Sequence, residues 1–328
     1  MTHLHYYQIK AQTHFELGYK TAHLFKESFF ETYSQLLEKA ASHTPLVTNA
    51  QSYLRLVTER FPYYIEELKG YANGMGIEFG NYWLMYLYTT LEEILEKCTT
   101  CFSSDGMIIG HNEDNYSFLA SRISLLEKTI QGTTILELYY SHGLGGDACG
   151  INSHGYVQTI NSLHHNDTQI GIPSSVIARW LSETKSPIND FEEMKKMTRA
   201  AGYSHTFGNL QGEVINIEST ARFAELVRPS LPFIHTNHHL TNLSIHEDTT
   251  NPGNSRERFN KATELAGSVK SPQDMMKLLE SVTSLPSNDE RTCKTLARMV
   301  FDLREKEVWC WLAQEASEGW IKYPIHFL

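Results

Sequence analysis

The 328-residue chain contains no long apolar run. No stretch approaches the roughly 18 consecutive apolar residues that a membrane-spanning helix requires. The first residues, MTHLHYYQIKAQTHF, also lack the basic and apolar regions of a signal peptide. We therefore expect a cytoplasmic protein with no membrane partner.

A block of basic residues is also absent. The chain has 28 lysines and arginines against 38 aspartates and glutamates, which gives a formal net charge of -10. A surface of this sign repels the phosphates of nucleic acids and of anionic lipids. We therefore expect no nucleic-acid partner.

Cysteine is scarce, and the five cysteines cannot all be paired. Cys98 and Cys101 form a CxxC pair, but no second CxxC completes a zinc set. His235 and His238 would point to opposite faces of a strand, and no HExxH helix accompanies them. The glycine-rich stretch 141–150 lacks the Lys-Ser/Thr of a P-loop. These patterns predict neither a metal nor a cofactor.

The spacing of apolar residues along the sequence changes near Cys98. Between residues 11 and 97 apolar residues recur at spacings of three and four, which is typical of helices. After Cys98 the pattern is that of strands, and Asp105-Gly106 signals a hairpin turn. Further strands are expected within 121–142, 147–163, 204–227 and 293–312, and helix pairs within 173–201 and 256–282. We expect one α+β domain, residues 1–328, in which helices cover two layers of sheet.

Cys98 stands where the helical part gives way to the first strand. One interpretation is a buried structural cysteine, because free cysteine is among the most buried residue types. The other is a nucleophile that attacks the carbonyl of Lys97 and breaks the chain between residues 97 and 98. The new terminal amine would have a pKa of about 8 and could accept the thiol proton.

A resemblance to a known family favours the second interpretation. The stretch KCTTCF…GHNEDN resembles the start of the mature chain in the penicillin acyltransferase-like family, whose members are self-processing N-terminal-nucleophile hydrolases. Its specific parts are Cys-Thr-Thr from Cys98 and the Gly-x-Asn-x-Asp motif that ends at Asp114. Weaker similarities follow the family's order: YIEELKGYANGMGI, CGINSHGYVQTINSL, IHTNHHL and SRERF. The resemblance implies a four-layer α-β-β-α sandwich, cleaved into residues 1–97 and 98–328.

The resemblance also implies roles for individual residues. Cys98 would be the nucleophile and new N-terminus, Asp114 would orient its amine with Arg256 paired to it, and Asn237 would stabilise the oxyanion. The expected substrate-contacting residues are Thr99, Asn112, Asn152 and His235. The implied enzyme is an amidase or acyltransferase that forms a Cys98 thioester and needs no cofactor. Its partners would be a small acyl-amide or acyl-CoA substrate and its own cleaved 1–97 chain, and a homodimer is left open.

One residue departs from the family pattern, and two other functions stay open. Lys97 occupies the position at which the best-known relatives have glycine, which eases the strained geometry of self-cleavage. Processing is therefore expected to be slow or incomplete. The first alternative is a conventional Cys–His hydrolase with His111 or His235 as its base. The second is a catalytically silent binding protein on the same fold.

Overall fold

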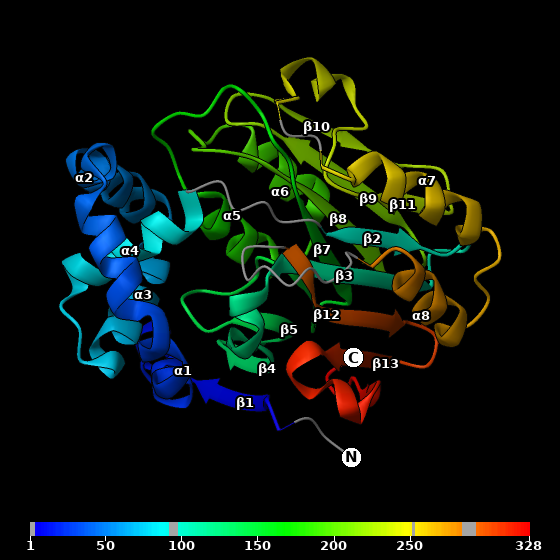
Figure 1. Cartoon of the computed structure of the whole chain (residues 1–328), viewed down its shortest axis with the longest axis horizontal. Helices are drawn as coiled ribbons and strands as arrows, with labels where there is room; N and C mark the ends of the chain where they lie inside the picture. Colours follow the sequence, from blue (N-terminus) through cyan, green and yellow to red (C-terminus); the bar gives the residue numbers. More distant parts are fainter. Residues whose placement is uncertain (1–3, 92–97, 251–252, 284–292) are drawn as a thin grey trace.

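The computed structural model describes residues 4–91, 98–250, 253–283 and 293–328. Lys97, on one side of the expected cleavage point, lies outside these residues. Two β-sheets pack face to face, and helices cover the outer face of each sheet (Figure 1). None of the described helices is both long and apolar enough to cross a membrane.

The N-terminal part is helical, as its sequence period predicts. Its elements are β1 (Tyr6–Ala11), α1 (His14–Ser42), α2 (Thr44–Arg60), α3 (Pro62–Met75) and α4 (Phe79–Leu91). Two glycines allow the backbones of α1 and α3 to touch. A Cβ on Gly18 would lie 1.8 Å from the carbonyl oxygen of Glu67, and one on Gly70 would lie 2.0 Å from that of Phe15. Larger residues at these positions would force the two helices apart.

The first sheet has eight strands in the order β1-β4-β5-β6-β7-β8-β9-β10. Strand β1 was not expected from the sequence, and it pairs in parallel with β4, whereas the other neighbours are antiparallel. Its other strands are β4 (Ile123–Ile130), β5 (Thr133–Tyr140), β6 (Cys149–Asn152), β7 (Tyr156–Ser162), β8 (Tyr203–Asn209), β9 (Val214–Ser219) and β10 (Ala224–Val227). The N-terminal region thus supplies a strand as well as helices.

The second sheet has six strands in the order β11-β2-β3-β12-β13-β14. These strands are β2 (Thr99–Phe102), β3 (Ile108–Tyr116), β11 (Phe233–His235), β12 (Cys293–Asp302), β13 (Glu307–Leu312) and β14 (Ile321–Pro324). The hairpin expected at Asp105-Gly106 joins β2 to β3, and Gly106 has a φ of 71°, which favours glycine. Its register pairs Thr99 with Asn112.

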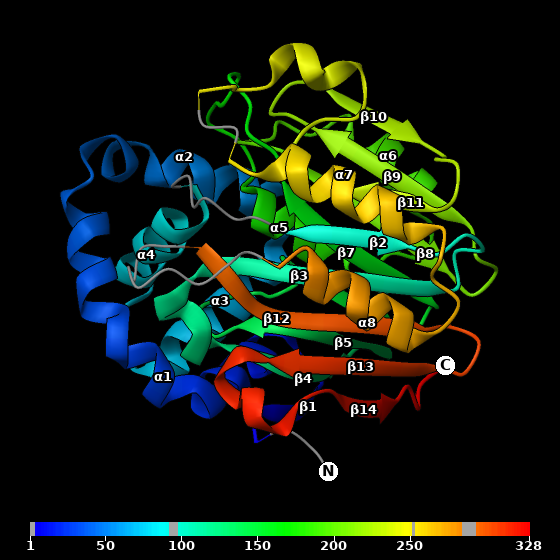
Figure 2. The same ribbon diagram turned by 45° about the vertical axis from the view of Figure 1, so that its right-hand side comes forward.

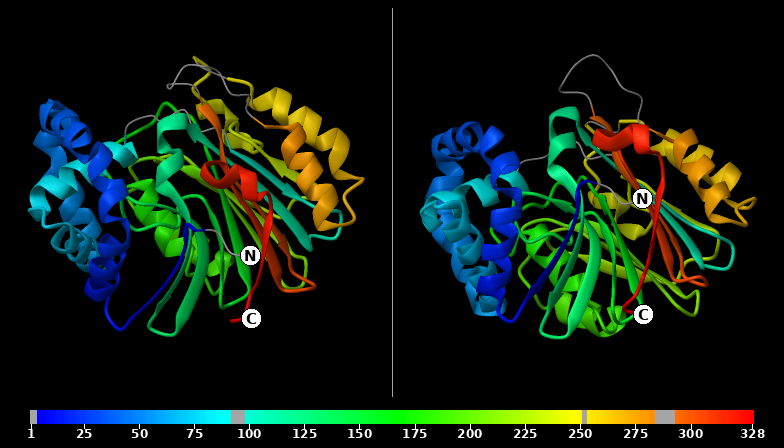
Figure 3. Two further views of the ribbon diagram at one scale, coloured as in Figure 1. Left: turned by 60° about the horizontal axis from the view of Figure 1, so that its bottom comes forward. Right: turned by 90° about the horizontal axis from the view of Figure 1, so that it is seen from below.

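The remaining helices complete the expected α-β-β-α arrangement (Figures 2 and 3). They are α5 (Ser174–Leu181), α6 (Pro187–Met194), α7 (Ser255–Ala266) and α8 (Pro272–Ser281), with short 3-10 helices at Ser117–Arg122, Asn242–His246 and Ala313–Glu318. Helices α7 and α8 cover the second sheet, while α5, α6 and the N-terminal helices cover the first. Apolar side chains such as Phe102, Leu138 and Met299 fill the space between the sheets. The helix expected to extend to residue 201 ends at Met194.

Candidate active site

Cys98 immediately precedes β2, and its side chain is buried. The hairpin register that pairs Thr99 with Asn112 sets Cys98 opposite Glu113 on β3. The thiol donates a hydrogen bond to Oε2 of Glu113 at 3.5 Å. The short β2–β3 turn therefore brings a thiol and a carboxyl group together.

Glu113 has two further partners. Its Oε2 lies 3.0 Å from Nε2 of His111, and its Oε1 accepts a hydrogen bond from the hydroxyl of Tyr140 at 2.7 Å. Burial raises the pKa of Glu113 to about 8 and lowers the pKa of His111 to about 3. At neutral pH the carboxyl is therefore mostly protonated and the imidazole is neutral. Residue 113 was not among the expected site residues.

The proton positions in this group follow from its hydrogen bonds. The hydroxyl of Thr100 donates to Oδ1 of Asn161 at 2.9 Å, so it has no hydrogen left for Nδ1 of His111, which lies 3.1 Å away. His111 must then donate from Nδ1, which leaves Nε2 to accept the proton of Glu113. A hydrogen-bonded path thus connects the thiol of Cys98, through Glu113, to Nε2 of His111.

Arg258 of α7 holds the start of β2 in place through hydrogen bonds. This buried side chain donates from Nη1 to the carbonyl oxygen of Cys98 at 2.7 Å and to Oγ1 of Thr99 at 2.6 Å. Its Nη2 donates to Oδ1 of Asn237 at 2.7 Å. Burial lowers the pKa of Arg258, and the nearby carboxylate of Asp114 opposes this effect. One guanidinium therefore connects Cys98, Thr99 and Asn237.

The expectation that Arg256 pairs with Asp114 is wrong. The side chain of Arg256 is 65% exposed, and its Nη2 lies 3.5 Å from Oε1 of Glu247. Two residues along a helix differ in direction by about 200°, so Arg256 and Arg258 cannot share a face. A sequence signal existed, because the spacing of four from Arg258 to the buried Ala262 and Ala266 marks the inward face of this helix.

Asp114 and Asn237 both lie in the described site. Asp114 is buried on the face of β3 opposite to Glu113, and its Oδ1 accepts a hydrogen bond from Oγ1 of Thr295 at 2.5 Å. Asn237 follows β11, and its Nδ2 donates to the carbonyl oxygen of Ser162 at 3.1 Å. Arg258 connects the two residues. It donates a hydrogen bond to Asn237, and the charge of Asp114 opposes the effect of burial on its pKa.

Three of the expected substrate-contacting residues bond to other parts of the protein. Nδ2 of Asn112 donates to the carbonyl oxygen of Leu279 in α8. Nδ2 of Asn152 donates to the carbonyl oxygens of Ser182 and Thr184. The structure does not bring these two side chains to Cys98, because strand alternation and the β6–β7 turn direct them elsewhere.

His235 is the third of these residues. Its Nε2 lies 2.8 Å from Oε1 of Glu218, and this contact, working against the effect of burial, lowers the pKa of Glu218 to about 2. His235 is therefore engaged with the first sheet and is not placed to act on Cys98. Thr99, by contrast, contacts Arg258 as part of the site.

The two vicinal cysteines face opposite sides of the second sheet, as strand alternation predicts. Cys101 lies in the apolar cluster beneath α8, with Met275 and Leu279, and burial raises the pKa of its thiol. Cys98 faces the polar group around Glu113. The thiol of Cys101 therefore lies among apolar side chains, whereas the thiol of Cys98 lies among polar ones.

The same polar group contains donor atoms that suit a metal. Among the described residues, a sulfur of Cys98, a nitrogen of His111 and an oxygen of Glu113 lie within 4.8 Å of one another. Thiolate, imidazole and carboxylate are all ligands that zinc accepts. Zinc bound there would occupy the sulfur of Cys98. The expectation that the protein needs no metal stays a prediction.

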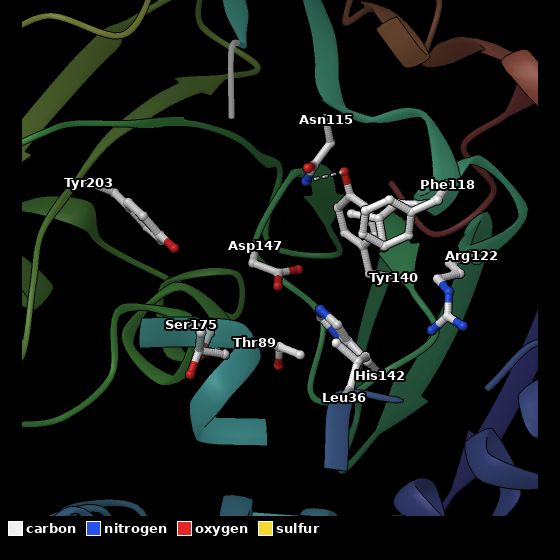
Figure 4. Close-up of a pocket in the computed structure, with 12 residues that line it drawn as sticks. Leu36, Thr89, Asn115, Phe118, Arg122, Tyr140, His142, Asp147, Ser175 and Tyr203 are labelled. Carbon is white, nitrogen blue, oxygen red and sulfur yellow. Dashed lines mark hydrogen bonds between the residues drawn. The ribbon is translucent and has the colours of Figure 1, made fainter. Parts of the chain in front are cut away.

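A cavity of about 70 Å³ adjoins the site (Figure 4). Tyr140 forms part of its wall, and the hydroxyl that bonds Glu113 also accepts a hydrogen bond from Nδ2 of Asn115 at 3.3 Å. The lining also includes Leu36, Phe118, Arg122, His142, Asp147, Ser175 and Tyr203. Tyr140 thus connects this cavity to the carboxyl group of Glu113, which contacts Cys98.

Residues 101–317, well over half of the chain, match the model of the AAT family, described as acyl-coenzyme A:6-aminopenicillanic acid acyl-transferase. The chain belongs to this family. The match begins at Cys101 and does not include Cys98, so the family assignment and the geometry around Cys98 are separate observations. The resemblance noted in the sequence is confirmed.

Individual proteins are similar over part of the chain. The beta-alanyl-dopamine/carcinine hydrolase of Drosophila melanogaster is 26% identical over 216 residues, which are 56% of this chain and 55% of that protein. This AAT-family chain thus spans about half the length of that curated relative.

Solved structures with a similar fold include a conjugated bile acid hydrolase variant from Clostridium perfringens and penicillin V acylase from Agrobacterium tumefaciens. The first has 10% identity and a TM-score of 0.48, over 70% of this chain and 92% of that one. The second has 10% identity and a TM-score of 0.43, over 66% and 83%.

Proposed function

We propose that this AAT-family chain is a self-processing amidase or acyltransferase whose nucleophile is Cys98. The observation that carries the proposal is that Cys98 makes two hydrogen bonds, one through its thiol and one through its carbonyl oxygen. Its thiol contacts Glu113, while its carbonyl oxygen accepts a hydrogen bond from the buried Arg258. A cysteine with only a packing role needs neither a proton acceptor for its thiol nor a charged donor for its carbonyl.

In the first stage the chain cleaves itself between Lys97 and Cys98. The sulfur of Cys98 attacks the carbonyl carbon of Lys97, and its proton passes to the carboxylate form of Glu113, which a pKa of about 8 makes accessible near neutral pH. The C–N bond then breaks, the nitrogen of Cys98 takes up a proton, and a thioester joins Lys97 to the sulfur. Water hydrolyses this thioester and releases residues 1–97 with a free carboxylate.

In the second stage the free α-amine of Cys98 accepts the thiol proton, as in other N-terminal nucleophiles. The thiolate attacks the substrate carbonyl, and the second amide hydrogen of Asn237 stabilises the oxyanion. Asp114 and Arg258 orient the new terminus from the other face of the sheet. The amine product leaves, and the Cys98 thioester passes its acyl group to water or to another amine.

The proposed substrates are small acyl-amides or acyl-CoA molecules, and the cleaved 1–97 chain stays bound as a partner. The curated relative is named for hydrolysis of beta-alanyl-dopamine and carcinine, which supports an amide substrate. The pairing of β1 with β4 supports retention of the cleaved chain, because backbone hydrogen bonds join the two pieces. A cytoplasmic location and a homodimer remain part of the proposal.

Intact-mass spectrometry of the purified protein tests self-processing. We expect two species, residues 1–97 and 98–328, that separate under denaturing conditions and migrate together under native ones. Cys98→Ala should remain whole. A wild-type chain that stays whole through long incubation would contradict self-processing.

The second candidate is a conventional cysteine hydrolase that is not cleaved, with His111 as its base. The proximity of Cys98, His111 and Glu113 favours this candidate. An intact chain that hydrolyses amides and loses activity when Cys98 is alkylated would support it. An intact chain whose Cys98 reacts with no electrophile would instead match a silent binding protein.

A further inference from the structure

The cavity beside the site contains a carboxylate oxygen that is shielded from solvent. Among the residues that the structure describes, Oδ1 of Asp147 has no hydrogen-bond partner. In Figure 4 the carboxylate of Asp147 points into the space between Tyr140, His142, Ser175 and Tyr203. Leaving a buried acceptor unsatisfied is unfavourable, and charged groups suffer most. Such a group is expected where a ligand supplies the missing donor.

Lys128, the cation whose charge opposes the effect of burial on the pKa of Asp147, is engaged with other groups. Nζ of Lys128 lies 2.6 Å from Oε1 of Glu137 and donates to the carbonyl oxygen of Leu144. Within the part of the chain that the structure describes, no ion pair includes Asp147. The local charge of this carboxylate is therefore not compensated by a salt bridge.

Two basic side chains, His142 and Arg122, also line the cavity, and neither forms a salt bridge with Asp147 among the described residues. Burial, together with the charge of Arg122, lowers the pKa of His142 to about 4, so this imidazole is neutral at pH 7. Arg122 itself lies beyond Tyr140 and His142 as seen from Asp147 in Figure 4. The end of the cavity around Asp147 is therefore acidic.

A second carboxyl group, that of Glu113, responds to the charge of Asp147. Burial raises the pKa of Asp147, and the charge of Asp147 is one of the causes that raise the pKa of Glu113. A cation bound at Asp147 would favour the charged form of this carboxyl group. Tyr140 connects them, because it lines the cavity and bonds Glu113, which contacts Cys98.

We propose that Asp147 is the receptor for an ammonium group of the substrate. The inference rests on the proposed function and narrows it to small amides that carry a primary ammonium near the scissile carbonyl. A cavity of about 70 Å³ has room for roughly five groups of water size, which suits a short aliphatic ammonium. Asp147 would accept its charge-assisted hydrogen bond.

Two matched pairs of reporters test the proposal on the purified full-length gene product after processing. The first pair is the β-alanyl and butanoyl 4-nitroanilides, which differ by an ammonium in place of a methyl group on the acyl side. The second is the acetyl amides of 1,3-diaminopropane and of butylamine, which place the ammonium on the amine side. We expect one ammonium-bearing member to have a kcat/KM higher than its neutral partner by about tenfold to a hundredfold.

Asp147→Asn keeps the shape of the side chain and removes its charge. We expect this variant to lose the preference, chiefly through a higher KM for the cationic reporter, so that the kcat/KM values of the two members of the pair become similar. Glu305→Gln removes one charge from an exposed turn and should retain the preference. Equal kcat/KM values within both wild-type pairs, or an unchanged preference in Asp147→Asn, would overturn the proposal.

A binding measurement separates this inference from the proposed function. Calorimetry on the wild-type protein compares 3-aminopropanamide with butanamide. Tighter binding of the cationic amide, absent in Asp147→Asn, supports the receptor even if no reporter is hydrolysed, and that failure would count against the proposed function alone. Equal binding of the two amides would count against the receptor.

Discussion

The thiol of Cys98 lies 3.5 Å from the carboxyl group of Glu113. In an uncleaved chain the nitrogen of residue 98 is part of a peptide bond and cannot act as a base. The contact therefore offers the thiol a proton acceptor before any α-amine exists. Under the proposed function, self-processing and turnover therefore use different bases, Glu113 first and the α-amine of Cys98 afterwards.

Glu113→Gln tests the first of these bases. Glutamine preserves the size of the side chain but cannot accept the thiol proton, and general-base catalysis is typically worth about a hundredfold or more. We expect self-processing to slow by at least this factor, measured as a time course of intact mass. Glu127→Gln, which changes a carboxylate of β4 that contacts Tyr6, is the control. Cleavage of Glu113→Gln at the wild-type rate would remove Glu113 from the mechanism.

The raised pKa of Glu113 also predicts how stability depends on pH. The folded state keeps this proton up to about pH 8, whereas the unfolded state loses it near its usual pKa of 4.5. The stability contributed by this group is therefore complete below pH 4.5 and is lost as pH rises through about 8. His111, with its pKa lowered from 6.5 to about 3, acts in the opposite sense only below pH 6.5.

Between pH 6.5 and 8, Glu113 is thus the titrating member of this pair. In Cys98→Ala, which keeps the chain whole, the free energy of unfolding should fall over this range by up to about 1.4 kcal/mol per pH unit from this residue. Adding Glu113→Gln should remove that component. Urea unfolding at several pH values measures it, and identical slopes for the two proteins would contradict the assignment.

The two arginines of SRERF form a matched pair for mutagenesis. Lysine cannot reproduce the planar fork with which Arg258 bonds Cys98, Thr99 and Asn237. We expect Arg258→Lys to slow processing and turnover by about tenfold to a hundredfold, the effect of losing one charge-assisted hydrogen bond. Arg256→Lys should behave as wild type, because Arg256 is exposed. The reverse result would restore the original assignment of Arg256.

The two vicinal cysteines should differ in reactivity after processing. A small electrophile is expected to label Cys98 first, because burial among apolar side chains raises the pKa of Cys101 and disfavours its thiolate. Cys101→Ala should retain most activity, whereas Cys98→Ala should have none. Peptide mapping after brief alkylation gives the order. Equal labelling of both thiols would show that the two environments are not distinct.

Local sequence determined much of this site. The change of period at Cys98, the turn at Gly106 and the two-residue alternation of strands fixed the β2–β3 hairpin and the opposite faces of Cys98 and Cys101. Asp114 and Asn237 were also identified from the sequence through short motifs. The hairpin depends on neighbours along the chain, because a short turn joins its two strands, whereas Asp114 and Asn237 bond to Thr295 and Ser162, which are distant in the sequence.

Only the tertiary structure decided the rest. The SRERF motif does not state which face of α7 meets the second sheet. Ala262 and Ala266 indicate that face, but the bonds of Arg258 to Cys98 and Asn237 exist only in the folded chain. The parallel pairing of β1 with β4 joins segments more than a hundred residues apart. Asp147 meets the Tyr140 wall only because β5 and the glycine-rich loop after it are packed against α4 and α5. Such contacts depend on burial between distant segments, and a local pattern carries no information about which distant segment will be the neighbour.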